Sequence, residues 1–582
     1  MNYRRFRDRS IFSLLRVSTM TIVVVLGGLF LTSLAFAQRD TQLDQLQREV
    51  NRLSDAITGS GLTGRMNIHQ MENDVTALKA AIARVVGPNW HVDDPSFEDP
   101  HFREQVQELQ AKVQSIEADL GKLKQAPTPA PPPDIGIALN VVWTLVTGFL
   151  VMFMQAGFAL VETGFVRKKN AAHTMAMNFM VYALGMLGYW MSGFAFQMGG
   201  VGDASSVSSL AGPSGSLGLG VGSQLAHELG ISLGGKFFGL LGGAGFFLPP
   251  NMLEGGIFAL FLFQMVFMDT AATIPTGAMA ERFMFRAFCW YGVAVGAVIY
   301  PLYANWVWGG GWLAALGKNF GLGHGVVDFA GSSVVHLCGG TIALVGACML
   351  GKRHKSGGES LSQHNLPFAV VGTFILAFGW FGFNAGSTLQ GTDTHIGVIA
   401  TNTALASAAG AVSAMIVVWR RFGKPDLSYM CNGMLAGLVA ITAPCAFVDS
   451  WAAVTLGILA GLMMNYSTKV LAERGVDDPV GAISVHGSCG ALGILALGVF
   501  ANGMYGADWN GVKGSMVKGL LYGDASQFVA QLIGCTACIA TVSAVSFLVF
   551  KLIRSTVGLR SLREDEEVGL DAAELGVEAY AD

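Results

Sequence analysis

Two histidines occupy matching places in two copies of one motif, and their chemistry makes them the first candidates for function. The copies read DFAGSSVVHLCGG from Asp328 and DPVGAISVHGSCG from Asp478. In each copy a glycine follows the aspartate by three residues and a histidine, His336 or His486, follows it by eight. Both lie in apolar stretches, where an ionisable side chain is costly to insert and therefore indicates function. A neutral imidazole donates and accepts hydrogen bonds, which suits the transfer of a proton or a small polar molecule.

The composition predicts an all-α, polytopic membrane protein. Of the 582 residues, 52% are hydrophobic and only 13% are charged, which departs from soluble proteins. The net charge of -4 is too small to indicate nucleic acid binding. Apolar runs of about 20 residues predict membrane helices. We expect eleven spans, at residues 137–161, 172–196, 257–278, 287–308, 329–350, 368–386, 396–419, 430–446, 451–466, 480–500 and 528–553.

The two motif copies predict an inverted repeat. From Asp328 to Asp478 the chain crosses five predicted spans, and an odd number of crossings turns the second copy upside down. A five-plus-five inverted repeat is typical of transporters, which place a shared site near the middle of the bilayer between the halves. We therefore expect His336 and His486 to face one another.

The charges in the connections predict the orientation of the core. One alternate set of connections, together with the C-terminal tail, holds 17 lysines and arginines, and the other set holds 4. Because positively charged loops stay in the cytoplasm, the core is expected to begin outside and end inside. Residues 1–37 have the arginines, apolar run and Ala-Phe-Ala ending of a cleavable signal peptide, which predicts a bacterial inner-membrane protein. An uncleaved anchor, adding a twelfth span, is the alternative.

An exported helical segment is predicted at residues 38–124. Apolar residues recur there at heptad spacing in three runs, at 43–57, 68–85 and 106–123. This is the seam of a coiled coil or helical bundle. A proline-rich linker follows at 125–134. We expect the segment to hold subunits together in the periplasm, and a site for a specific partner is the alternative.

Two more groups of residues belong to the candidate site. Asp328 and Asp478 fall near helix starts, where capping of free backbone amides is the interpretation we favour; Asp328 could also orient an incoming cation. Trp308 and Ser387 fall at the outer ends of their spans, where an indole face and a hydroxyl could bind a small cation. Spacing alone would assign the remaining aromatic residues to core packing: Phe263, Phe267, Trp306, Trp380, Phe381 and Phe383.

From about residue 142 to the C-terminus the sequence resembles the ammonium transporter (Amt/Mep/Rh) family, in particular its Amt branch. The motifs are QAGFALVETGFVRKKN from Gln155, GAMAER from Gly277, VWGGGW from Val307, the DFAG…VVH block, GWFGFNAGS from Gly379 and DDP…VHG from Asp477. The resemblance implies a homotrimer of eleven-span subunits, each with its own pore, that carries ammonium or methylammonium inward.

The resemblance also implies roles for individual residues. Phe267, Trp308 and Ser387 match an external ammonium-recruiting site, and Asp328 matches the aspartate beside it. Phe267 and Phe383 match a stacked gate. His336 and His486 match the twin pore histidines, and Trp380 matches a pore-lining tryptophan. Phe263 belongs to the same aromatic group.

Residues 554–582 resemble the family's cytoplasmic tail, which meets PII-type signalling proteins. Leu575 and Val577 replace the histidine and glutamate usual in its last motif, which weakens that expectation. Nothing in the sequence predicts a metal, a cofactor or an enzyme, since no nucleophile–base pair or metal-ligand cluster is present. The predicted function is ammonium transport by recruitment of ammonium, deprotonation and passage of ammonia. The alternatives are an ammonium sensor that signals through a partner and a neutral-gas channel of the Rh type.

Overall fold

The computed structural model describes residues 44–51, 68–86, 100–125, 133–201, 219, 225–252, 255–354, 361 and 363–580. It divides into two compact units at Pro131 and Pro132. The predicted signal peptide and most of the predicted linker lie outside the described residues.

The first unit is helical and matches the heptad pattern. Residues 44–51, α3 (Ile68–Val86) and α4 (Pro100–Gln125) are helices. The heptad-position residues whose side chains the structure describes form one buried cluster, and Val50, Val106 and Leu109 have no exposed surface. Lys79 of α3 pairs with Glu117 of α4 at 2.5 Å. The seam is therefore the core of this unit.

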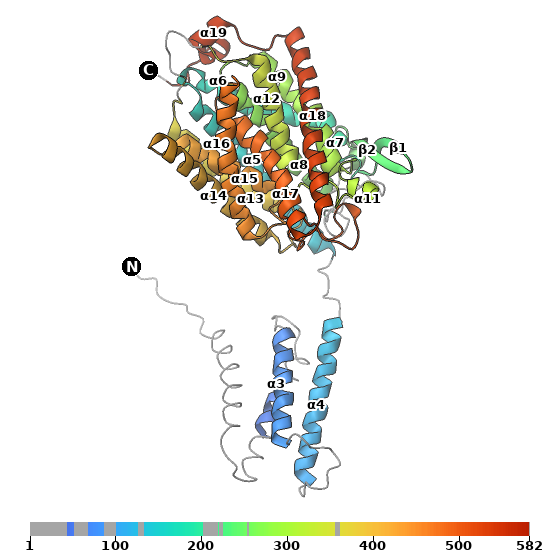
Figure 1. The fold of residues 1–582 in the computed structure, drawn as a ribbon. Helices are drawn as coiled ribbons and strands as arrows, with labels where there is room; N and C mark the ends of the chain where they lie inside the picture. Colours follow the sequence, from blue (N-terminus) through green and yellow to red (C-terminus); the bar gives the residue numbers. More distant parts are fainter. Residues whose placement is uncertain are drawn as a thin grey trace, which may run out of the picture. The chain divides into compact units, whose positions relative to one another are not determined.

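The second unit is a bundle of long apolar helices (Figure 1). Its first half contains α5 (Pro133–Phe165), α6 (Ala171–Gly188) with η2 (Tyr189–Gly193) and α7 (Phe194–Met198), α8 (Gly255–Met279), α9 (Phe285–Ala294) with η6 (Val295–Ile299), α10 (Tyr300–Ala304) and η7 (Asn305–Gly309), and η8 (Ser332–Leu337) with α12 (Cys338–Leu350). Its second half contains α13 (Leu366–Gly386), α14 (Ile396–Phe422), α15 (Leu427–Thr442), α16 (Ser450–Glu473), and η9 (Ile483–Ser488) with α17 (Cys489–Phe500). The helix α18 (Ala525–Thr556) follows, and then the tail elements α19 (Arg563–Val568) and η12 (Asp571–Leu575).

Each predicted span corresponds to one of these helices or to a continuous run of helices and η segments. In the described part of the chain, ten are long and apolar enough to cross a membrane, and α15 is a shorter apolar helix of 16 residues. The sequence predicts a short ninth span at residues 451–466, but the corresponding helix α16 has 24 residues. The last turns of α16 carry charged residues. A search for apolar runs stops at these residues, although the helix continues through them.

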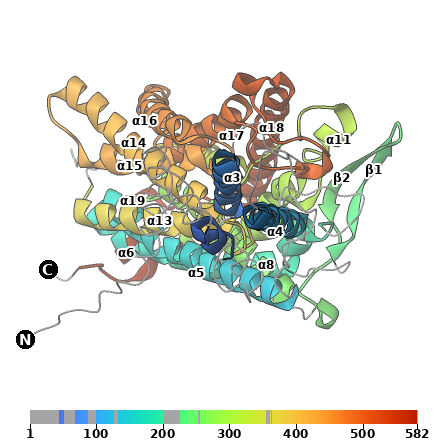
Figure 2. The same ribbon diagram turned by 90° about the horizontal axis from the view of Figure 1, so that it is seen from below.

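The two halves meet in the way that an inverted repeat requires. The first helices of the halves, α5 and α13, pack along one another, and η8 contacts η9. Figure 2 shows α5 and α13 side by side. The matching elements of the two halves therefore lie at one shared interface.

A β-hairpin interrupts the all-α pattern and was not predicted. The strands β1 (Glu228–Leu233) and β2 (Lys236–Gly242) pair antiparallel around Gly234 and Gly235. Both glycines have positive φ, which a two-residue hairpin turn demands. Apolar residues on both sides of a Gly-Gly pair could have indicated this hairpin. The segment is short, however, and a search for membrane-length apolar runs does not select it.

Candidate functional site

The two motif histidines touch at the interface between the halves. Nδ1 of His336 lies 3.1 Å from Nδ1 of His486, and the ring planes are inclined by 28° with centroids 5.2 Å apart. Both side chains are buried. Two ring nitrogens at this distance form a hydrogen bond only if one donates and the other accepts, so the pair can share one proton between them. The prediction that these side chains face one another is confirmed.

The motif aspartates set where each histidine helix begins. The Asp328 carboxylate accepts hydrogen bonds from four backbone amides, those of Gly331 to Val334, at 2.7–2.9 Å, and from the Ser333 hydroxyl. Asp478 accepts from the amides of Gly481, Ala482 and Ile483 at 2.8–3.0 Å. Such bonds satisfy the free amides of a helix N-terminus.

These caps explain why both helices start later than predicted. Gly331 and Gly481 adopt φ of 113° and 81°, which glycine tolerates far better than other residues. The segments from aspartate to glycine are therefore caps, so the helical turns begin at Ser332 and Ile483 instead of at 329 and 480. The Asp328 carboxylate faces its own helix. Asp328 contacts the aromatic residues with its backbone carbonyl, which accepts a hydrogen bond from Nε1 of Trp308 at 2.7 Å.

Aromatic rings extend from the histidine pair in an unbroken series. His336 stacks near Phe383 at a centroid distance of 5.4 Å, and Phe383 stacks on Phe267 at 4.0 Å. Phe267 meets Trp308 edge-on at 6.0 Å. Phe263 touches Phe267 at 4.6 Å. The structure therefore brings the predicted gate, tryptophan and histidines together, in the order Trp308, Phe267, Phe383, His336, His486 along the series.

Trp380 of α13 and Ser387, the residue that caps the C-terminus of α13, flank this series. Trp380 stacks on His336 at 5.1 Å, and its Nε1 donates to the Thr442 hydroxyl at 2.9 Å. The Ser387 hydroxyl donates to the carbonyl of Phe383 at 2.8 Å. Its oxygen can therefore accept one more hydrogen bond from a visiting donor.

Sequence reasoning missed the residues beyond His486. The Phe158 ring lies 6.0 Å from the His486 ring, and both line a narrow cavity with Glu162 and Asn432. Glu162 is only 2% exposed and accepts a hydrogen bond from Asn178 at 2.7 Å. The signal was present, because Glu162 is an ionisable residue near the end of a predicted span.

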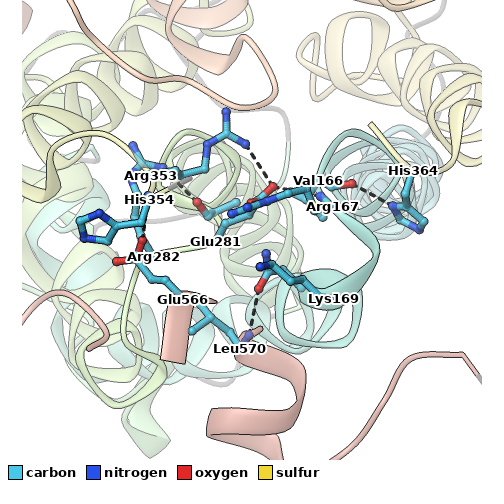
Figure 3. Close-up of polar contacts among 12 residues, drawn as sticks. Val166, Arg167, Lys169, Glu281, Arg282, Arg353, His354, His364, Glu566 and Leu570 are labelled. Carbon is cyan, nitrogen blue, oxygen red and sulfur yellow. Dashed lines mark hydrogen bonds and ion pairs between the residues drawn. The ribbon is translucent and has the colours of Figure 1, made fainter. Parts of the chain in front are cut away.

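Charged residues from distant motifs meet at the end of the bundle where the tail lies (Figure 3). Glu281, in the left-handed region at φ of 70°, pairs with both Arg167 and Arg353. Arg353 also holds Asp477 with side-chain bonds of 2.9 Å. Burial opposes ionisation of Asp477, but the bonds and the charge of Arg353 outweigh it and lower its pKa to about 2.

The tail attaches to the same end of the bundle. The Asp571 carboxylate accepts from the amides of Ala172 and His173 at 2.9 and 2.7 Å, at the start of α6. The Leu570 amide donates to the Asn170 side chain at 2.9 Å. Burial raises the pKa of Glu574, but hydrogen bonds from His173, Ser561 and Phe285 lower it by more, so the net shift is downward.

In the part of the chain that the structure describes, no group of three or more His, Cys, Asp and Glu side chains is placed to hold a metal ion. The histidine pair is flanked by the aromatic rings of Trp380 and Phe383.

Comparisons with known proteins agree on one family. Residues 142–580 match the model of the Ammonium Transporter Family. Ammonium transporter Amt2 of Archaeoglobus fulgidus is 44% identical over 451 residues, covering 76% of this chain and 88% of the relative. Ammonium transporter Amt1 of Haloferax mediterranei is 35% identical over 472 residues, covering 78% and 81%.

Solved structures give the same result. A structure titled "Sensor Amt Protein" aligns with a TM-score of 0.62 at 32% identity, covering 76% of this chain and 99% of that one. Candida albicans Mep2 aligns with a TM-score of 0.59 at 26% identity, covering 74% and 87%. The family match, the identities and the helical membrane fold lead to one conclusion: this chain belongs to the ammonium transporter family, and it is a transporter and not an enzyme.

Proposed function

We propose that ammonium binds beside Trp308 and Ser387, loses a proton, and crosses as ammonia past Phe267 and Phe383 and along the His336–His486 pair. The observation that carries this proposal is the 3.1 Å contact of the two imidazoles at the end of an unbroken series of aromatic rings. It supports a narrow apolar route that contains a hydrogen-bonding step.

The physics of such a route favours ammonia over ammonium. An ion taken from water into an apolar passage loses its hydration, at a cost of several kcal/mol or more in a protein. Ammonia needs only a few hydrogen-bond partners, and the imidazoles provide a donor and an acceptor. Nε2 of His336 is buried and has no hydrogen-bond partner among the described residues, so it is available to a passing molecule. Sodium and potassium have no proton to lose, so the same route rejects them.

We also propose that the protein is a homotrimer in a bacterial inner membrane. Its N-terminal helices then lie in the periplasm and its C-terminus in the cytoplasm. The charge bias of the connections supports this orientation. The seam of the first unit is buried as a core of its own, so we infer that the exposed faces of these helices, and not the seam, hold subunits together.

The attachment of the tail to the start of α6 supports a cytoplasmic regulatory role. A PII-type protein remains a candidate partner there. The replacement of the usual histidine and glutamate by Leu575 and Val577 removes two polar contacts that such a partner could use.

An ammonium sensor is the second candidate function, because one structural neighbour carries that title. Reconstitution into liposomes distinguishes the candidates. A transporter that separates the proton from ammonia and moves both gives an inward current when ammonium is added. A neutral-gas channel changes the internal pH without current, and a sensor gives neither signal. Absence of both signals from well-folded protein would refute the transport mechanism.

A further inference from the structure

The mouth of the route beyond His486 contains a carboxylic acid that the recruitment and histidine steps do not use. Glu162 lies on α5, four residues after Phe158, so both side chains lie on one face of the helix. Phe158 meets the His486 ring at 6.0 Å. The cavity at His486 is lined by both residues, together with Asn432, Val480 and Val485. Glu162 therefore lines the compartment that a molecule enters after passing the histidine pair.

Neighbouring residues hold the Glu162 side chain in place. Its Oε2 accepts a hydrogen bond from Nδ2 of Asn178 at 2.7 Å. Asn178 is fixed in turn, since its Nδ2 also donates to the backbone carbonyl of Thr174 at 3.0 Å and its backbone carbonyl accepts from Nε2 of Gln155 at 2.5 Å. Gln155 accepts from Thr273 of α8 at 3.0 Å. A carboxyl group held this firmly presents its other oxygen in one direction.

Gly277 leaves room on the side of that other oxygen. A Cβ atom built on Gly277 would lie 2.9 Å from Oε1 of Glu162 and 2.3 Å from a methyl group of Val480. Glycine at this position lets the Glu162 carboxyl lie close to the backbone of α8, which a side chain there would prevent.

We propose that Glu162 exchanges a proton with ammonia at this mouth. In the forward direction the O–H bond of the Glu162 acid breaks, an N–H bond forms on ammonia, and ammonium leaves into solution. The remaining carboxylate then takes a proton from hydronium on the same side, which restores the acid. Burial favours the neutral form of a carboxyl group, so it carries a transferable proton when ammonia arrives. The inference rests on the proposed passage of ammonia past the histidines.

The other titratable groups around Glu162 are already engaged. Asp478, whose charge acts on Glu162, is held by the amides at the start of η9. Tyr291 of α9, which Glu162 influences, donates to the carbonyl of Ala272 at 2.7 Å. His486 is bonded to His336. Among these groups, Glu162 is therefore the carboxylic acid that lines the cavity, since Asp478 and Tyr291 are not part of its wall.

Infrared difference spectroscopy on the reconstituted full chain tests the proton exchange directly. Perfusion with ammonium should change a protonated carboxyl band in the wild type, and Glu162→Gln should abolish that change. Asp269→Asn is the matched control, because Asp269 is also a carboxyl 2% exposed in a membrane helix but does not line this cavity. The control should keep the band change. If the wild type shows no band change, or if Glu162→Gln retains it, the proposal is wrong, whether or not the protein carries current.

Transport measurements provide the second readout. Glu162→Gln still bonds to Asn178 but cannot release a proton, so the maximal ammonium current should fall roughly tenfold or more, in the lower part of general acid–base effects. The dependence of this current on the pH of the solution beyond His486 should also disappear. Glu162→Asp should keep part of the current and part of its pH dependence. Wild-type current and pH dependence in Glu162→Gln would overturn the proposal. Loss of current in the wild type itself would instead count against the transport mechanism.

Discussion

Gly340 of α12 meets Gly487, the residue after His486, with no room for a side chain between them. A Cβ atom built on Gly340 would lie 2.2 Å from the backbone nitrogen of Gly487, far inside van der Waals contact. The neighbouring atoms are backbone and cannot rotate away. This contact therefore sets how closely the His486 turn approaches the helix that follows His336.

Gly340→Ala should separate the two imidazoles without changing either of them. We expect transport to fall by about 10²-fold, because a displacement near 1 Å has that effect on positioned reacting groups. Uptake of labelled methylammonium by proteoliposomes measures the loss. Gly487→Ala is the control, since its added Cβ would have its nearest contact at 3.5 Å, an ordinary separation. Equal uptake by both variants at equal protein stability would contradict the importance of the histidine contact.

Replacing both His336 and His486 by alanine should leave a folded protein without selective ammonium uptake. The replacements remove every imidazole donor and acceptor from the route, while the caps made by Asp328 and Asp478 remain. Ammonium-elicited current and methylammonium uptake are the measurements, with thermal unfolding in detergent as the control for folding. Uptake at the wild-type level would exclude the histidines from the mechanism.

Ser387→Ala and Trp308→Leu should each weaken the apparent affinity for ammonium. At Trp308 the lost cation–π contact contributes about 0.5–2 kcal/mol, which corresponds to a rise of roughly 2- to 30-fold in apparent KM. At Ser387 the lost group is a hydrogen-bond acceptor for the cation. The control is Trp306→Leu, because the Trp306 indole donates to Leu240 of the hairpin instead of joining the ring series. Current measured against ammonium concentration separates the three variants. An unaltered KM in both test variants would place the recruiting site elsewhere.

The Asp477–Arg353 pair should stabilise the tail end of the bundle in a pH-dependent way. The pKa of Asp477 is lowered to about 2 from an unfolded value near 3.9, so its stabilisation is complete above about pH 5 and is lost as the pH falls toward 2. A shift of this size corresponds to roughly 2–3 kcal/mol.

Asp477→Asn should therefore lower the melting temperature at pH 7, and the difference from the wild type should shrink in acid. Thermal unfolding at a series of pH values measures this. Glu473→Gln is the control, because its pairing with Lys469 joins two exposed side chains at 3.7 Å. A difference for Asp477→Asn that stays constant with pH would refute the assignment.

The histidine contact was predictable because the repeat relates residues distant in sequence. The length of the apolar runs was enough to locate the membrane helices, because a helix must be about 20 apolar residues long to cross the bilayer. Local apolarity could not show that α15 is shorter than α16, because helix ends depend on caps and loop packing. Glu162 was within reach as an ionisable residue, but its relation to His486 arises only when α5 packs against η9. Pairings such as Glu281 with Arg353 depend in the same way on the assembled fold.

Deleting residues 38–124 should lower the thermal stability of the proposed trimer without lowering ammonium transport. The first unit buries its own seam and is joined to the transport unit by a short proline-rich stretch, so its loss leaves the pore helices in place. A finer test places a charge in the seam. Val113→Asp buries a carboxylate where a 2% exposed valine was, at a cost of roughly 3 kcal/mol or more, whereas Gln114→Asp changes an exposed position. Native mass spectrometry and melting of the detergent-solubilised oligomer measure both. If the deletion and Val113→Asp leave oligomer stability unaltered, these helices do not reinforce the trimer, and their exposed surface becomes the place to look for a partner.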